Sequence, residues 1–340
     1  MRLSHCLPSL SLAVLALTLT ASLAFAGKTG CDGKNALDEI KAKDAAAYAR
    51  IRTAADAAKN GKNVLWKIDS EEFPDRPASY LYGTLHLSDE RLFAFGPHIE
   101  EALSVSQRIA TGGEDMSPAR LLEAFSVMHE TLVEGKAARL ETLLARPEAE
   151  RANVVLARTE MAKDLQPRVR PWVVLALNTQ SKCEAERLHQ GKLTQDGELE
   201  RLAENRGVGS FGLETAEMQL GALAAIPDDA QVSLLKANLA SHDRIDDQTE
   251  ALVQLYLAHD LGALWPLQME LAKMHGADPK ALDTYRHTVV DVPNARMRDR
   301  AMMHLAQGGV FFAVGAVHLS GDKGLVELLR SEGFKITAVE

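Results

Sequence analysis

One pattern of strand, glycine and histidine occurs twice in this chain, near its two ends. The segment LYGTLHLSDE contains Gly83 and His86, and the segment AVGAVHLSGDKGL contains Gly315 and His318. Each glycine follows aliphatic and aromatic residues typical of a buried strand, where it lets the backbone turn or approach another backbone closely. Both histidines are followed by Leu-Ser and a charged turn. The two ends of the chain are therefore expected to form one α/β core.

The two histidines are candidates for one shared site. Binding sites of open α/β sheets lie beyond the carboxyl ends of the strands. Imidazole can ligate a transition metal or transfer protons near neutral pH. For a single histidine of this kind, a local role in capping the strand end is the alternative. The repeated context favours convergence of His86 and His318, with Gly83 and Gly315 as the motif glycines.

A metal site built on two histidines also needs a carboxylate. The candidate ligands are Glu114, Asp115 and Glu214, which lie near the ends of two further candidate strands, RIATGG and GSFGLE. Acidic residues in such places are more often solvated turn residues, which is the alternative for each. The ions considered for this site are manganese, cobalt and zinc. The chain contains no Gly-x-Ser-x-Gly elbow, phosphate loop or dinucleotide fingerprint.

The remaining pattern predicts an α/β (α+β) fold with a mixed sheet and a large helical insertion. The apolar runs NVLWKID and SYLYGTL predict a hairpin, and FKITAVE predicts a last strand. Apolar residues at three- and four-residue spacing predict one solvent-exposed helix over 34–58. The predicted parts are sheet segments 63–115, 208–214 and 308–340, a helical insertion at about 117–206, and further helices at about 216–305.

The N-terminus predicts export. Arg2, the apolar run LSLAVLALTLTASLA and Ala24-Phe25-Ala26 are typical of a signal peptide over residues 1–26, cleaved after Ala26. Residues 27–62 are then an N-terminal helical arm, and residues 63–340 are the main domain. The expected location is the periplasm or the cell exterior, with no retained transmembrane segment.

Charge and cysteines agree with an exported protein. The formal net charge of −9 becomes −10 when Arg2 is removed, which argues against a nucleic-acid partner. Outside the signal peptide two cysteines remain, Cys31 and Cys183. In an oxidising compartment an even pair favours one disulfide, and two separate thiols are the alternative.

The motifs resemble those of the TraB/GumN family, related to the Tiki group of extracellular metal-dependent proteases. The matching segments cover about residues 63–340 in order: LWKI, SYLYGTLHL, RPW, GLETAEMQL and GGVFFAVGAVHLSGDKGL. The resemblance implies two related halves around a helical insert. In the Tiki relatives, the two histidines and a strand-end glutamate support peptide hydrolysis. Distant relatives include erythromycin esterases and a haem-binding protein, and GumN members are associated with exopolysaccharide gene clusters, so fold alone does not define function.

The resemblance also bears on single residues. The segment CDGKNAL and the pair Cys183-Glu184 are similar to one periplasmic branch, which supports a Cys31–Cys183 disulfide. Gly112 stands where the family has its glutamate. Glu114 follows on the same face of the strand, about 7 Å further along. Pro293 stands at a family arginine, next to a retained asparagine, so that Arg296 or Arg298 from the following helix is the candidate replacement.

Two functions follow from these residues. The first is a metal-dependent, peptidase-like hydrolase in which His86 and His318 hold the ion with Glu114 or Glu214. Glu114 or a histidine would accept the proton, and Arg298 or a neighbouring arginine would stabilise the oxyanion. The alternative is a non-catalytic periplasmic binding protein, or an envelope polysaccharide accessory protein, that uses the same pocket for a metal, haem or a glycan. The expected ligand is a peptide or a glycan.

Overall fold

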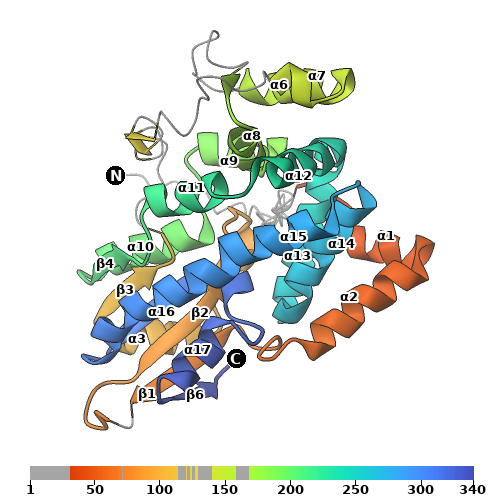
Figure 1. Cartoon of the computed structure of the whole chain (residues 1–340). Coiled ribbons are helices and arrows are strands. Elements are labelled where there is room, and N and C mark those ends of the chain that lie inside the picture. Colours follow the sequence, from red (N-terminus) through yellow and green to blue (C-terminus); the bar gives the residue numbers. More distant parts are fainter. Residues whose placement is uncertain are drawn as a thin grey trace, which may run out of the picture.

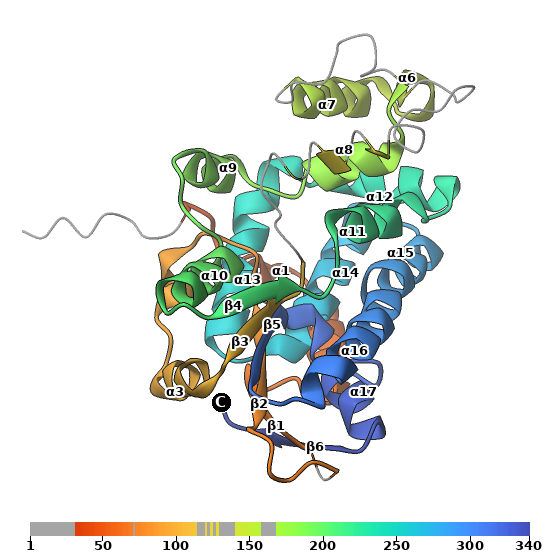
Figure 2. The same ribbon diagram turned by 90° about the vertical axis from the view of Figure 1, so that its left-hand side faces the viewer.

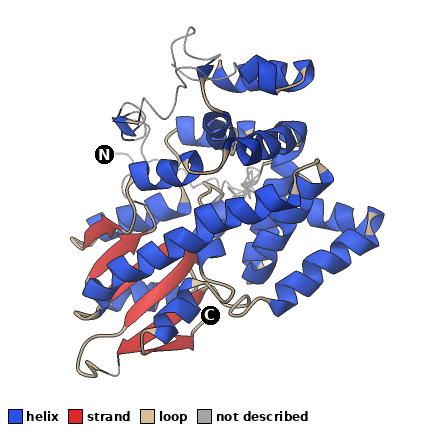
Figure 3. Cartoon of the chain, in the orientation of Figure 1, coloured by secondary structure: helices blue, strands red, loops and turns tan. Residues whose placement is uncertain are grey.

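A six-stranded mixed sheet joins residues from both ends of the chain (Figures 1 and 3). The strand order is β4-β3-β5-β2-β1-β6, and β1 alone runs against the other strands. The predicted α/β class with a mixed sheet is therefore confirmed. The strands are β1 (Leu65–Ser70), β2 (Ser79–Thr84), β3 (Arg108–Thr111), β4 (Gly209–Gly212), β5 (Val310–Gly315) and β6 (Phe334–Ala338).

The computed structural model describes a large part of the 340-residue chain. The described residues are 31–70, 72–113, 120, 123, 124, 127, 128, 140–157 and 168–340. The predicted signal peptide and the candidate ligands Glu114 and Asp115 lie outside them, as does part of the predicted insertion. None of the described helices is both long and apolar enough to cross a bilayer.

The pairing within the sheet follows from the sequence of its strands. β1 and β2 form the predicted antiparallel hairpin, in which Leu65 lies opposite Tyr82. β5 pairs in parallel with β2 on one side and with β3 on the other. A central parallel strand is covered on both faces and therefore needs a continuous apolar run. The run from Val310 to Val314 is fully buried for this reason.

Helices cover both faces of the sheet, and more helices lie beyond the carboxyl ends of its parallel strands (Figures 1 and 2). α3 (Pro97–Val105) and α10 (Gln195–Asn205) lie on one face, and α16 (Val292–Leu305) and α17 (Leu325–Ser331) lie on the other. The other helices are α1 (Ala36–Lys43), α2 (Ala45–Ala57), α6 (Leu140–Leu143), α7 (Arg146–Leu156), α8 (Pro171–Leu177), α9 (Lys182–His189), α11 (Ala216–Ala224), α12 (Asp228–Ala240), α13 (Ile245–Leu257), α14 (Leu264–Met274) and α15 (Pro279–Arg286).

The short helical turns complete the described elements. They are η1 (Glu90–Phe93), η3 (His242–Arg244), η4 (Leu261–Ala263), η6 (Ala316–His318) and the π-helical segment η5 (His287–Asp291). Two hydrophobic cores result. The main core contains the sheet and the helices packed on it, and the second core lies among α7, α8, α11, α12 and α15.

The prediction of one exposed helix over 34–58 is wrong. Two helices, α1 and α2, meet at Asp44, whose carboxylate accepts a hydrogen bond from the Ala47 N–H at 2.9 Å. A capping aspartate satisfies the first free N–H groups of a helix, so it starts a new helix here. The arm is also not solvated on all sides, because Ile40 and Ile51 are buried in the main core.

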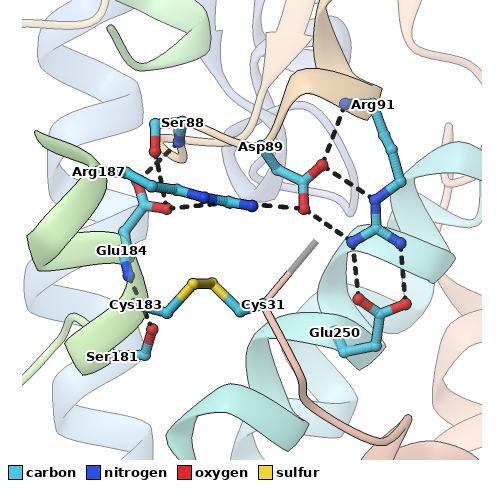
Figure 4. The surroundings of a disulfide bond; sticks show 9 residues. All are labelled: Cys31, Ser88, Asp89, Arg91, Ser181, Cys183, Glu184, Arg187 and Glu250. Atoms are coloured by element: carbon cyan, nitrogen blue, oxygen red, sulfur yellow. Dashed lines mark hydrogen bonds and ion pairs between the residues drawn. A yellow bond between two sulfur atoms is a disulfide. The ribbon is translucent and has the colours of Figure 1, made fainter. Parts of the chain in front are cut away.

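The predicted disulfide between Cys31 and Cys183 is present (Figure 4). Its two Cα atoms lie 5.9 Å apart, and 152 positions separate the cysteines in the sequence. The bond ties the start of the N-terminal arm to the first turn of α9. It is compatible with the predicted oxidising compartment.

Gly83 allows the turn after β5 to pack directly on β2. A Cβ at position 83 would lie 3.0 Å from Leu319 Cδ2 and 3.2 Å from the Cα of Ala316. Both distances are shorter than normal carbon–carbon contacts, and one of the atoms belongs to the backbone. The first motif glycine thus brings the second motif close to its own strand.

We predict that Gly83→Val lowers the free energy of unfolding by about 1–3 kcal/mol, because a side chain there overpacks the contact between β2 and η6. Chemical denaturation monitored by circular dichroism measures the change. The matched control is Gly209→Val in β4, where a Cβ would meet nothing within 4 Å. Equal stability of the two variants would contradict the importance of this close approach.

Candidate functional site

Both motif histidines lie beyond the carboxyl ends of two neighbouring parallel strands. β2 pairs with β5 so that Thr84 lies opposite Gly315. His86 comes two residues after Thr84, and His318 comes three residues after Gly315, so the two lie at the same edge of the sheet. A Cβ at position 315 would lie 3.3 Å from His318 Cδ2. The second motif glycine therefore leaves room for the imidazole to lie against the strand end.

His86 is held by Asp196, a carboxylate that no sequence motif identified. The Nδ1–H of His86 donates to Asp196 Oδ2 at 3.2 Å, and Asp196 Oδ1 accepts from the Thr84 hydroxyl at 2.7 Å. Desolvation lowers the pKa of His86, but the hydrogen bond to Asp196 and the nearby charges of Glu184 and Glu200 outweigh it, so the pKa is raised from 6.5. The imidazole, 59% exposed, remains accessible to a ligand.

His318 is in a different environment. Its Nδ1 lies 2.7 Å from Asn294 Oδ1, and Asn294 Nδ2 donates to the Lys323 carbonyl at 2.7 Å. The second bond fixes the orientation of the amide, so Nδ1 of His318 carries the proton and Nε2 has the free lone pair. Burial lowers the pKa of His318 to about 4.

The lowered pKa of His318 has a consequence for stability. Between about pH 6.5 and pH 4 an unfolded chain binds a proton at this histidine that the folded chain does not bind. Folding stability therefore falls as the pH decreases through this window. At neutral pH His318 of the folded chain is uncharged, and its contribution stops depending on pH well above pH 6.5, where the unfolded chain has also lost the proton.

The position of Asp196 depends on the buried residue before it. Gln195 is 0% exposed. Its Oε1 accepts from the Leu85 N–H at 2.8 Å, and its backbone N–H donates to the Leu87 carbonyl at 3.0 Å. Its Nε2 donates to the hydroxyls of Tyr82 and Tyr256. The N-terminus of α10 is thus fixed to the loop that carries His86.

The end of β3 lies between the ends of β4 and β5. Gly112, at the position of the expected family glutamate, has space for a side chain, since a Cβ there would lie 3.6 Å from Val314 Cα. The Thr111 hydroxyl lies 2.8 Å from the Gly113 carbonyl oxygen and 2.9 Å from Glu200 Oε1, and its one hydrogen can bond to either. Glu200 follows Asp196 by one helical turn on α10. Two carboxylates of α10 therefore lie along the sheet edge, although the sequence pattern marked neither.

Glu214, a predicted metal ligand, is buried after β4 and is already paired. Its Oε1 accepts from Arg296 Nη1 at 2.9 Å, and Arg300 donates to the carbonyl of the preceding Leu213 at 2.9 Å. Desolvation raises the pKa of Glu214, and Arg296 opposes this shift without cancelling it. The carboxyl group is therefore better suited to proton transfer than an exposed glutamate is.

The structure does not bring the predicted catalytic Arg298 to the histidines. Its guanidinium bonds to Asp299 at 2.7 Å and to Glu332, beside α17, at 2.9 Å. Arg296 is instead the arginine that reaches the end of β4. A catalytic role for Arg298 stays a prediction, and Arg296, the other candidate from the sequence, is the one that lies at the end of β4.

Pro293 has a structural role in the helix before the histidine turn. α15 continues through the π-helical segment η5 into α16, where Pro293 lies in the first turn. Proline lacks an N–H and its ring clashes with the preceding turn of an α-helix, and a wider π turn relieves the clash. Asn294, which follows, is 1% exposed and bonds to His318.

The described residues do not form a complete set of metal ligands. In the described ranges no group of three His, Cys, Asp or Glu side chains is arranged to hold a metal. His86 and His318 each have Nδ1 engaged by an oxygen, which is the usual arrangement of metal-ligating histidines. Glu214 is paired with Arg296, and β4 lies three strand positions from β2, about 14 Å away. Glu114 lies outside the described residues.

Comparison with known proteins places the chain in a family. A family model described as the TraB/PrgY/gumN family matches residues 64–338. No match was found among curated proteins or among solved structures. The matched range includes every strand of the sheet, both motif histidines and the partners of their rings.

We predict that the two histidines titrate separately. His86 should have a midpoint above 6.5, and His318 should have one near 4. Asp196→Asn should lower the pKa of His86, because it removes the negative charge bonded to the ring. NMR titration of the imidazole carbon-bound protons measures both values.

The control for this titration is Glu198→Gln. Glu198 lies on the same helix, but its partner is Arg201, so the pKa of His86 should not change. Coincident titration of His86 and His318 near pH 6.5 would contradict the two environments.

Proposed function

Because this chain belongs to the TraB/PrgY/gumN family, we propose that it is an exported hydrolase whose active site is the sheet edge with His86 and His318. The observation that supports this most is the contrast between the two imidazoles. Asp196 favours the charged form of His86, and burial favours the neutral form of His318. Neighbouring groups with pKa values shifted in opposite directions are typical of an acid and a base at one site.

The residues suggest a division of roles. His318, neutral at pH 7, has Nε2 free to accept a proton from an attacking water. His86, with its charged form favoured by Asp196, is suited to donate a proton to the leaving group. Arg296 places a positive charge at the end of β4, where it can stabilise a developing oxyanion. Peptide bonds are the first substrate to test, because of the resemblance to the Tiki group.

A divalent metal, namely manganese, cobalt or zinc, is part of the proposal. In this metal-bound form of the site, Nε2 of His86 and Nε2 of His318 would hold the ion, with Glu114 or Glu214 as the carboxylate, and the carboxylate would transfer the proton in place of the rings. Such an ion polarises a carbonyl group and lowers the pKa of its bound water. Asp196 and Asn294 would then fix the orientation of the two rings.

A non-catalytic binding protein is the second candidate. It is favoured by Gly112, which offers no carboxylate at the family position, and by the pairing of Glu214 with Arg296. In this case the same edge would bind a metal, haem, a peptide or a glycan without turnover.

We predict that purified protein of residues 27–340, supplied with manganese, cobalt or zinc, binds near-stoichiometric metal and hydrolyses peptides. His86→Ala/His318→Ala should lose the metal and lower kcat/KM by at least about 100-fold, because the rings can then neither ligate an ion nor transfer a proton. Elemental analysis and a peptide-library cleavage assay measure these effects. His98→Ala, at an exposed position of α3, is the control and should behave as the wild type.

The outcomes separate the candidate functions. Metal without hydrolysis would support the binding protein. Hydrolysis without metal would support acid–base catalysis by the two histidines alone. Neither metal nor hydrolysis in the wild type would contradict the hydrolase proposal.

We predict further that Gly112→Glu tightens metal binding by at least about tenfold, because it restores a carboxylate at the edge next to β5. The variant should fold normally, since a Cβ at position 112 makes only ordinary contacts. Isothermal titration with each metal measures the affinity. Gly209→Glu, also at a strand glycine with free space, is the control. Equal affinities of the two variants would argue against a metal at this edge.

A further inference from the structure

We propose that Glu184 is a positioning residue for His86 and that the Cys31–Cys183 disulfide keeps it in place. The relevance of this to catalysis rests on the proposed function, in which His86 is an active-site residue. The positioning itself concerns only the loop after β2 and can be tested without a substrate.

Glu184 binds the loop two residues beyond His86. Its Oε1 accepts from the Ser88 N–H at 2.6 Å, and its Oε2 accepts from the Ser88 hydroxyl at 3.0 Å (Figure 4). The side chain is 2% exposed. A buried carboxylate that accepts both hydrogen bonds of one residue restricts that residue strongly, because each bond has a charged acceptor. Ser88 is thereby fixed relative to α9.

The loop after β2, which carries His86, is also held on the side of α13 by a set of ion pairs. Asp89 accepts from the guanidinium of Arg91, which also forms a two-bond ion pair with Glu250 of α13. Arg187 of α9 lies 3.8 Å from Asp89 and 3.9 Å from Glu184, so it joins the two sets (Figure 4). The loop of His86 is thus held between α9 and α13.

α9 itself has little apolar packing to hold it. Its only fully buried side chain is that of Glu184, which is polar, while Cys183 and Leu188 are partly buried. The hydrophobic effect, which docks most helices, is therefore weak here. The disulfide attaches the residue next to Glu184 to the N-terminal arm, which Lys34 ties to α13 through Asp247 at 2.7 Å. The disulfide therefore holds α9 in position, as an apolar face does for most helices.

Breaking the disulfide should loosen α9 and, with it, the loop that carries His86. Reduction adds two electrons and two protons to the Cys31–Cys183 bond and gives two thiols, while a dithiol reductant is oxidised to its own disulfide. α9 then retains mainly the polar contacts of Glu184 and Arg187. His86 would lose part of its restraint although Asp196 remains bonded to it. The site would therefore be formed fully only after export to an oxidising compartment.

Hydrogen–deuterium exchange of the full mature chain, residues 27–340, tests the proposal. We expect exchange in residues 85–91 to become about tenfold faster or more in Glu184→Ala and in dithiothreitol-reduced wild type, because the Ser88 amide loses a charged acceptor. Exchange in β5 should not change. Glu186→Ala, at an exposed position of the same helix, is the control. Reoxidation of the reduced protein should restore slow exchange.

Two results would overturn the proposal. The first is unchanged exchange of residues 85–91 in either Glu184→Ala or the reduced protein. The second is faster exchange in β5 as well, which would mean general unfolding rather than release of the loop. If peptide hydrolysis is found, kcat should fall with little change in KM in both forms. Absence of hydrolysis in the wild type would count against the proposed function, and the exchange result would still decide the positioning.

Discussion

The parallel pairing of β2 with β5 is the interaction on which the rest of the structure depends. These strands come from opposite ends of the chain, and their register alone brings His86 and His318 to one edge. The close approach of Ala316 to Gly83 leaves no space for a side chain between the two motifs. Pairing between such distant residues has a high entropic cost, since a long loop must be closed first.

The sheet and the helices contribute differently to the candidate site. The strands determine where the imidazoles lie, whereas helices provide the groups that bond to their Nδ1 atoms. Asp196 comes from α10 and Asn294 comes from α16, and these helices lie on opposite faces of the sheet. Two histidines with the same local sequence pattern thus acquire different chemistry. Similar motifs do not imply similar roles when the partners come from elsewhere in the chain.

The sequence was informative where local pattern decides the structure. The apolar runs that lead into Gly83 and Gly315 correctly predicted the strands of both motifs. The even number of cysteines correctly predicted the disulfide. The helical arm was misjudged because a capping residue such as Asp44 interrupts a helix without altering its hydrophobic spacing.

The partners of the site were harder to predict, because they depend on tertiary packing. Asp196 stands in an ordinary acidic first turn of a helix, and only the buried contacts of Gln195 bring it to His86. Which arginine of α16 reaches the end of β4 depends on how that helix is rotated about its axis. Arg296 and Arg298 lie on opposite sides of the buried stripe through Met297 and Ala301, and the sequence does not tell which side faces β4.

The disulfide also changes the topology of the chain. It closes a covalent ring from Cys31 to Cys183 that contains β1, β2, β3 and the loop with His86, while β4, β5 and β6 lie outside the ring. A single proteolytic cut within the ring cannot separate the two resulting pieces, because the cystine still joins them. Such a nicked molecule would keep both histidines in one covalent unit, and only a cut followed by reduction would divide it.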